Sequence, residues 1–329
     1  MIKFNRRILL TVLVTGVALA VLAGVTPSAA ADKVSLITDA GFLGRHAYYF
    51  VAIEKGYYKD ANLDVTILRG QGSAEAVKQV AAGNATFGFA DAGSTVLARG
   101  NDNVPVRLVA IVYSRPPHAI YALKGSGIEK PKDLEGRQIA NPASGAIVQV
   151  FPAYAKAAGI DQSKVKWVVA SSESLPGLLA LGRVDAIGQF TVGEPRLKKD
   201  APGKELVELT FADAGLDFYS NGIIASDNTI TSNPDLVQRF VTATVKGLKD
   251  ALDNPQEAAE IMKKYHRELD VELGAAELVK VRELARVANS PLGKIDAKRA
   301  QSTIDLVATA FSLKSPVKVE DAFDLRFVK

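Results

Sequence analysis

The amino-acid sequence predicts an α/β fold of two lobes, with mostly parallel sheets and a cleft between them. Three observations predict it. Short apolar runs alternate with helical patterns, which is typical of parallel strands joined by helices. A turn-rich stretch at 125–131 separates two such series. A helical tail follows Asn221-Gly222. We expect this tail to rejoin the first series, which makes the first lobe discontinuous.

The first 31 residues have the pattern of an export signal. Lys3, Arg6 and Arg7 precede an uncharged apolar run at 8–25, and small residues follow at 28–31. We expect cleavage after Ala30 or Ala31. The apolar run is long enough to span a bilayer, so a retained membrane anchor is the alternative. The chain has no cysteine, which excludes disulfides, thiolate metal sites and a lipid-modified cysteine. These features predict a free protein of the Gram-negative periplasm.

The net charge and the length of the mature chain limit which kinds of partner it can bind. Three of the 40 Lys and Arg lie in the signal, which leaves 37 against 36 Asp and Glu. A nearly neutral chain offers no broad basic surface for nucleic acid or lipid. About 300 mature residues suit two lobes of ordinary domain size. We therefore expect a soluble monomer whose main ligand is a small molecule.

The first series contains four strands and two helices. We expect the strands at 34–38, 63–68, 86–90 and 106–112. We expect the helices at 47–55 and 73–82. The second helix has an apolar stripe formed by Val77, Val80 and Ala81, and Gly83 is a natural stop for it.

The second series repeats this alternation and a set of helices follows it. Its predicted strands are 137–140, 165–170 and 184–190. Its predicted helices are 146–158 and 175–181, closed by Gly159 and Gly182. Further helices are expected at 234–252, from 255 onward, at 275–288 and at 297–311. Segments 119–123 and 219–225 are the candidate crossings between lobes. The lobes would then be 32–118 with 223–329, and 119–222.

Loops after strands are the candidate ligand site. In open α/β sheets, ligands bind beyond the carboxyl ends of strands, where helices begin. Four such junctions carry Gly, Ser or Thr, two in each proposed lobe, and they supply free N–H groups and hydroxyls. Ordinary helix capping is the structural alternative for each of them. From these junctions we select Gly72, Ser73, Asp91, Gly93, Ser94, Thr95, Ser144, Gly145 and Ser172.

Two further segments add side chains of other kinds. The loop GFLGRHAYY at 41–49 brings Arg45, His46 and Tyr48 close together, as in an aromatic small-molecule pocket. Phe190 and Glu194 leave a strand and are expected to face the cleft. Helix-start N–H groups favour an anionic or acceptor-rich ligand, whereas Glu194 would favour an amine or a ring N–H. A pyrimidine-like heterocycle and an organic anion therefore both remain open.

Catalytic and metal motifs are missing from the sequence. The three histidines are His46, His118 and His266, and none has the spacing of a metal motif. There is no phosphate-binding glycine loop and no nucleophile elbow. We expect no enzyme activity, no catalytic residue, no metal and no cofactor.

The sequence also resembles a known family. It is similar to the periplasmic binding proteins for thiamine pyrimidine precursors, alkanesulfonates, taurine and nitrate, which serve ABC importers and share a fold with the fungal pyrimidine-precursor synthase. The matching words are HAYYFVAIEKGYY at 46–58, NLDV at 62–65, VAAGNATFG at 80–88, KDLEG at 132–136 and GRVDA at 182–186. They cover nearly all of the mature chain.

The resemblance implies a type II periplasmic-binding-protein clamshell with two crossing segments. It also implies an ABC permease with its ATPase as partners. In the pyrimidine-binding branch, Trp and Asn normally stand at the positions of Ala40 and Leu43, and a ligand-facing glutamate stands at Glu194. The ligand class is therefore left open. A signalling receptor as partner and a synthase-like enzyme are the alternative functions, although the synthase uses a cysteine-rich motif that is missing here.

Overall fold

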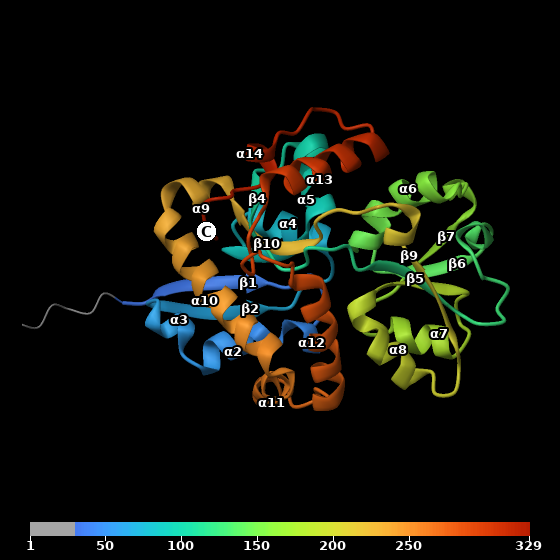
Figure 1. Cartoon of the computed structure of the whole chain (residues 1–329), viewed down its shortest axis with the longest axis horizontal. Coiled ribbons are helices and arrows are strands. Elements are labelled where there is room, and N and C mark those ends of the chain that lie inside the picture. The colour runs from blue at the N-terminus through green and yellow to red at the C-terminus, as the bar shows by residue number, and fades with distance from the viewer. Residues whose placement is uncertain (1–29) are drawn as a thin grey trace, which may run out of the picture. The chain divides into compact units, whose positions relative to one another are not determined.

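Two five-stranded β-sheets organise the chain (Figure 1). The computed structural model describes residues 30–329, so the predicted signal lies almost wholly outside the described residues. The first sheet has the strand order β2-β1-β3-β10-β4, and the second has the order β7-β6-β8-β5-β9. The strands are β1 (Asp32–Ile37), β2 (Leu63–Leu68), β3 (Phe87–Asp91), β4 (Val106–Ile111), β5 (His118–Leu123), β6 (Gln138–Asn141), β7 (Lys166–Val169), β8 (Ala186–Phe190), β9 (Leu206–Thr210) and β10 (Asn221–Ser226).

Each sheet is mostly parallel and contains one reversed strand. In the first sheet β1 is parallel to β3, while β10 is antiparallel to both β3 and β4. In the second sheet β6 is parallel to β7 and β8, while β5 is antiparallel to β8 and β9. The reversed strands, β5 and β10, are the ones that the chain enters when it passes from one sheet to the other.

The two predicted crossings exist, and the chain passes between sheets just before the ranges expected for them. The segment 112–117 connects β4 to β5, and 211–220 connects β9 to β10. The ranges 119–123 and 219–225 are mostly the reversed strands themselves. Both strands are buried, and each lies next to an edge strand of its sheet. The exact lobe boundaries remain a prediction. We call the first sheet with its helices the first lobe, and the second sheet with its helices the second lobe.

Helices cover both faces of each sheet (Figure 1). Helices of the first lobe are α2 (Ala47–Glu54), α3 (Tyr57–Asp60), α4 (Ser73–Ala81), α5 (Ala92–Asp102), α9 (Asp227–Ser232), α10 (Pro234–Asp253), α11 (Pro255–Tyr265), α12 (Val271–Ala285), α13 (Ala297–Ala310) and α14 (Val319–Ala322). Those of the second lobe are α6 (Ala146–Ala158), α7 (Leu175–Ala180) and α8 (Glu194–Asp200). Short 3-10 turns lie at 44–46, 131–134, 162–164, 191–193 and 212–214.

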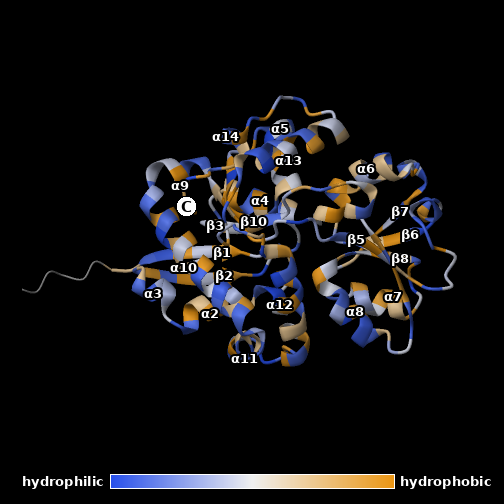
Figure 2. Ribbon diagram, in the orientation of Figure 1, coloured by the Kyte–Doolittle hydropathy of each residue, from blue (hydrophilic) through white to orange (hydrophobic). Residues whose placement is uncertain are grey.

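The apolar faces of these helices form the cores. Along α10 the buried positions recur with helical spacing, and Figure 2 shows hydrophobic and hydrophilic residues alternating along this helix. Phe240 of α10 stacks on Phe87 of β3 with ring centroids 4.0 Å apart. In the second lobe Tyr154 of α6 stacks on Phe211 at 4.2 Å. Burial of such rings stabilises both lobes.

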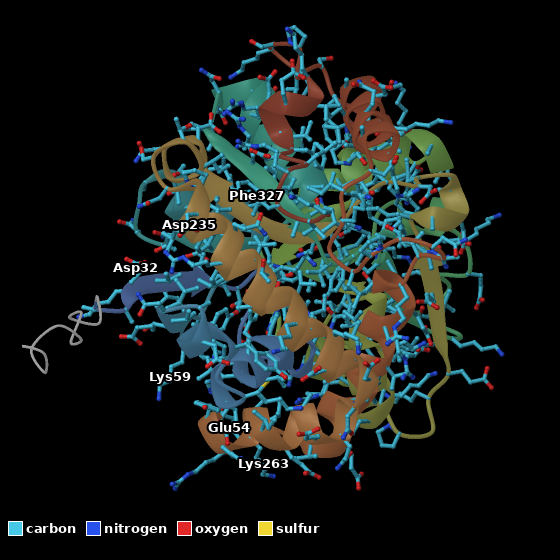
Figure 3. The ribbon with its side chains drawn as sticks, turned by 60° about the vertical axis from the view of Figure 1, so that its left-hand side comes forward. Asp32, Glu54, Lys59, Asp235, Lys263 and Phe327 are labelled. Atoms are coloured by element: carbon cyan, nitrogen blue, oxygen red, sulfur yellow. The ribbon has the colours of Figure 1, made fainter. Side chains whose placement is uncertain are left out.

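Polar contacts at one end of the first lobe hold α11 against α2. Figure 3 shows Glu54 of α2 and Lys263 of α11 on the same side of the molecule. The Tyr265 hydroxyl donates to Glu54 Oε2 at 2.9 Å, and Lys264 pairs with the same carboxylate. None of the helices between residues 30 and 329 is both long enough and apolar enough to cross a membrane.

The predicted elements agree with the structure to within a few residues, apart from some that the sequence did not signal. Gly159 ends α6 in the left-handed conformation with φ of 69°, as its position predicted. Helix α5 was not predicted, since its AGSTVLARGND sequence has two glycines and little periodicity. Strand β9 was also not predicted. Trp167 of β7 is partly buried and meets Phe151 with ring centroids 5.1 Å apart.

Candidate ligand-binding site

A small cavity lies between the two lobes at the carboxyl ends of their strands. Its volume is about 40 Å³. Since a water needs roughly 10–15 Å³ measured in this way, the cavity holds only a few waters in this closed arrangement. The first lobe contributes Asp39, Ala40, Arg45, Gly72 and Ser73. The second lobe contributes Asn141, Pro142, Gly145, Ala146, Ile147, Ser172, Leu175, Gly188, Gln189 and Phe190.

Arg45 is the cation of this cavity, and its charge is already compensated. One guanidinium nitrogen lies 3.4 Å from both carboxylate oxygens of Asp39. Both side chains are about 95% buried, so the pair is shielded from solvent. The guanidinium also lies over the Phe190 ring, 5.6 Å from its centroid, which brings the two lobes together. Its Nε is buried and has no hydrogen-bond partner within the described residues.

Asp39 connects the cavity with one of the crossings. Besides Arg45, it accepts from His46 Nε2 at 2.9 Å and from Asn221 Nδ2 at 2.9 Å. Asn221 is the first residue of β10, directly after the crossing 211–220. Burial alone would raise the pKa of Asp39, but the Arg45 guanidinium and the His46 hydrogen bond outweigh burial and hold this pKa below its ordinary value. Asp39 is therefore a carboxylate at neutral pH.

Two more titratable groups lie around Arg45. Burial lowers the pKa of His46, an effect that Arg45 reinforces and Asp39 partly opposes. The Arg45 backbone N–H donates to Glu277 Oε2 of α12 at 3.1 Å. Burial raises the pKa of Glu277, although the Arg45 charge and the backbone donor partly offset it. A neutral His46 and a paired Arg45 leave no net positive charge at the cavity.

Asn141 is the main polar side chain that the second lobe buries at the cavity. It ends β6 and is 5% exposed. Its Nδ2 donates to the Gly188 carbonyl of the neighbouring β8 at 2.7 Å. Its Oδ1 is buried without a hydrogen-bond partner among the described residues.

The start of α4 is occupied by the second lobe. The Ala74 N–H in its first turn donates to the Ser144 carbonyl at 3.1 Å, and the Ser144 hydroxyl donates to the Gln71 carbonyl at 2.9 Å. A Cβ at Gly72 would lie 2.3 Å from Ser144 Oγ, so this close approach of the lobes requires glycine. One N–H group that could have bound an anion is therefore already used.

Comparison with known proteins identifies the family. The model of the NMT1/THI5-like family matches residues 44–258. The riboflavin-binding protein RibY of Chloroflexus aurantiacus is 30% identical over 86% of this chain and 82% of its own. The chain belongs to the NMT1/THI5-like family. The formylaminopyrimidine-binding protein of Halalkalibacterium halodurans is 26% identical over 84% of this chain and 85% of its own.

Proteins named as enzymes are also similar to this chain, and the fold has wider relatives. A 4-amino-5-hydroxymethyl-2-methylpyrimidine phosphate synthase of Aspergillus parasiticus is 24% identical over 70% of this chain and 69% of its own. The alkanesulfonate-binding protein SsuA of Xanthomonas axonopodis is 15% identical, with a TM-score of 0.70 over 90% of this chain and 99% of its own. The predicted clamshell fold, family resemblance and solute-binding role are confirmed.

Six residues predicted for the site of this NMT1/THI5-like protein line the cavity together. They come from both lobes and are Arg45, Gly72, Ser73, Gly145, Ser172 and Phe190. Seven of the others lie elsewhere in the first lobe or at the contact between lobes, namely His46, Tyr48, Asp91, Gly93, Ser94, Thr95 and Ser144. Glu194, the last of them, lies outside the cavity at the start of α8.

The residues outside the cavity have structural partners in this arrangement. Asp91 caps α5 by accepting from the Ser94 N–H at 2.9 Å, and Thr95 donates to the Asp91 carbonyl at 2.9 Å. Tyr48 is fully buried in the first core and lies beside Tyr49. Glu194 pairs with Lys198 at 2.7 Å and with Lys280 of the first lobe at 3.1 Å. Their roles in ligand binding stay predictions.

Sequence reasoning missed the polar residues on which the chemistry of the cavity depends. Asp39 follows β1, and Asn141 ends β6, so the rule that ligands bind beyond strand ends would have selected both. The junctions selected at that edge are the ones that carry Gly, Ser or Thr. Gln189 lies inside β8 and had no such signal. Between residues 30 and 329 no cluster of His, Asp or Glu has the arrangement of a metal site.

Proposed function

We propose that the protein is the periplasmic component of an ABC importer and that it carries a neutral, flat nitrogen heterocycle. The two lobes enclose a cavity lined by residues of both, as expected for a protein that holds a small solute between them. Relatives that cover more than four fifths of the chain bind riboflavin and a formylaminopyrimidine, by their names. The permease and its ATPase are the proposed partners, and the binding protein acts as a non-catalytic monomer.

The Arg45–Asp39 pair is the main reason for proposing a neutral solute. A sulfonate or nitrate bound beside Arg45 would give this buried site a net negative charge, because Asp39 already balances the guanidinium. Burying an uncompensated charge is costly. A neutral ring with carbonyl or ring-nitrogen acceptors can use the free Nε donor without adding charge. This observation supports the heterocycle over the organic anion, the two ligand classes that the sequence left open.

A screen of four probes by thermal unfolding tests the proposed class of solute. The probes are riboflavin, a formylaminopyrimidine, an alkanesulfonate and nitrate. We expect one of the two heterocycles to raise the unfolding temperature, since ligand at a hundred times its Kd stabilises the fold by about 2.7 kcal/mol. We expect no shift with the two anions. Stabilisation by the sulfonate or nitrate, with none by either heterocycle, would contradict the proposal.

A charge variant makes the screen sharper. Asp39→Asn keeps the size of the side chain and removes the charge that balances Arg45. We expect this variant to bind the alkanesulfonate at least about tenfold more tightly than the wild type does, because the guanidinium becomes available for a charged hydrogen bond. Lys124→Gln, which alters an exposed ion pair within the second lobe, is the control and should change neither preference.

The proposed location is tested separately. We propose that the mature chain starts at Ala31 or Asp32 in the periplasm, based on the charged start, apolar run and small residues of the first 31 positions. Mass spectrometry of the protein from periplasmic extract should give one of these N-termini. An intact chain recovered from the membrane fraction would show that the segment is retained as an anchor.

A further inference from the structure

We infer that Asn141 determines specificity by accepting a hydrogen bond from an N–H group of the solute. The inference rests on the proposed function and specifies which solutes the cavity selects. Asn141 lines the cavity from the second lobe, is 5% exposed, and has one amide atom without a partner among residues 30–329. Asn141 was not among the residues selected from the sequence.

The neighbouring carbonyl decides which amide atom faces the solute. The side chain of an asparagine has one donor end and one acceptor end, and the two are told apart by their partners. One end lies 2.7 Å from the Gly188 carbonyl oxygen, which can only accept. That end must therefore be Nδ2. The end left without a partner is Oδ1, which can only accept.

Two glycines make the space in which this amide is held. A Cβ at Gly145 would lie 2.3 Å from Asn141 Oδ1, and a Cβ at Gly188 would lie 2.6 Å from Nδ2. Neither glycine has the positive φ that would explain it by backbone conformation alone. Room for the Asn141 side chain accounts for both, which indicates that the amide is built into the site in one orientation.

The first lobe presents the opposite kind of group to the same cavity. Arg45 Nε is buried and unpartnered within the described residues, and it can only donate. A buried polar atom without a partner costs free energy, so a solute that pairs with both atoms is favoured over one that pairs with a single atom. The solute should carry a donor N–H for Asn141 and an acceptor oxygen or ring nitrogen for Arg45.

This pattern is met by cyclic imides and by aminopyrimidines. Both carry an N–H and an acceptor on one planar ring. Nitrate and alkanesulfonates in their ionised forms have acceptors only, so they would leave Asn141 Oδ1 unpaired. The amide of Asn141 therefore disfavours binding of nitrate and alkanesulfonates. The Arg45–Asp39 pair disfavours the same anions by an independent interaction.

The test removes each side of the proposed hydrogen bond in turn. The probe is whichever of riboflavin and the formylaminopyrimidine binds in the screen, together with its analogue methylated at the ring N3 or at the exocyclic amine. Calorimetric titration gives the Kd of each for the wild type and for Asn141→Leu. We expect methylation to weaken wild-type binding about ten- to a hundredfold. We expect the leucine variant to bind both forms with the same weak affinity.

Asn141→Asp is the matched variant that separates chemistry from folding. With its buried carboxyl protonated, this variant can donate to the Gly188 carbonyl and keep an acceptor at Oδ1, so it should keep the preference for the unmethylated probe. Circular dichroism of the ligand-free variants establishes that each is folded. Equal discrimination by wild type and Asn141→Leu, or no loss on methylation of the probe, would overturn the inference while leaving the proposed function intact. Binding of the anions alone would overturn both.

Discussion

At the scale of single residues, burial decides which groups around Arg45 are charged. His46 shows this most clearly. Its Nδ1 lies 3.3 Å from the Leu43 N–H, which must donate to it, and its Nε2 donates to Asp39 at 2.9 Å. These partners require the neutral ring with its proton on Nε2, because a second proton on Nδ1 would face the Leu43 N–H. The geometry agrees with the lowered pKa of His46.

The first prediction follows from this ring. Because the pKa of buried His46 lies below its ordinary 6.5, the unfolded chain takes up a proton there before the folded chain does. The free energy of unfolding should therefore fall as the pH falls below about 6.5. His46→Gln should lack this part of the pH dependence. Urea unfolding between about pH 5 and 8 measures it, and equal slopes for both proteins would contradict the prediction.

Glu277 acts on the pH dependence in the opposite direction. Its pKa in the folded protein is raised above the ordinary 4.5 by burial. The folded state therefore holds this proton more tightly, and stability is lost as the pH rises from about 4.5 through the raised pKa. Glu277→Gln is the control that removes this second contribution. In this background, the remaining pH dependence of the free energy of unfolding can be assigned to His46.

At the scale of elements, α12 contacts both the loop at 41–49, which carries Arg45, and the second lobe. A Cβ at Gly44 would lie 2.3 Å from the Gly274 Cα, so the loop and this helix are in close backbone contact. Further along the helix, Lys280 pairs with Glu194 of α8 at 3.1 Å. Asp270, just before α12, pairs with Lys199 of α8. These ion pairs cross between the lobes in this closed arrangement.

The second prediction concerns these crossing pairs. Lys280→Gln should weaken solute binding by about two- to fivefold at low salt, because a partly exposed pair contributes about 0–1 kcal/mol to the closed state. The loss should disappear near 1 M salt, where the Debye length is about 3 Å. Kd measured at both ionic strengths tests this, with Lys124→Gln as a control pair that lies within one lobe.

Glu194→Gln distinguishes the crossing pair from direct ligand contact. If Glu194 acts through Lys280, its effect should match that of Lys280→Gln and vanish with salt. The sequence had predicted that Glu194 faces the ligand. A loss of about tenfold or more that persists at high salt would support that prediction against the crossing pair.

At the scale of the two lobes together, the cavity lined by Arg45 and Asn141 is too small for a heterocycle in this arrangement. The cavity of about 40 Å³ is bounded by both lobes, and Arg69 of the first lobe pairs with Glu173 of the second at another pocket between them. A solute can enter only if the lobes separate. The crossings at 112–117 and 211–220 are the segments that connect them, and they are the expected hinge.

The third prediction is that solute shifts the population toward a closed form. A solute that touches both lobes favours a form in which they close around it over the open form, and this difference drives the shift. Small-angle scattering should give a larger radius of gyration for the free protein than for the protein saturated with its heterocycle. An unchanged radius at saturation would contradict closure. Asn141→Leu at the same probe concentration should remain nearer the free value.

Local patterns were enough to determine most elements of this protein. Alternation of apolar runs and helical stripes placed the strands and helices, and Gly159 marked the end of α6 because only a left-handed residue suits that position. The rule of strand carboxyl ends then brought Gly72, Gly145 and Ser172 to one cavity. These are properties of neighbouring residues and of chain topology, which the sequence carries by itself.

Only the tertiary structure decided which polar groups meet each other. Asp39 and Asn221 are 182 residues apart, and Lys280 and Glu194 come from different lobes. The partner of a buried charge is set by packing of distant segments, because desolvation makes an unpaired charge costly wherever the chain buries it. The sequence determined a clamshell with a ligand site at its cleft. The fold decided that Arg45 is neutralised and that Asn141 is left with a free acceptor.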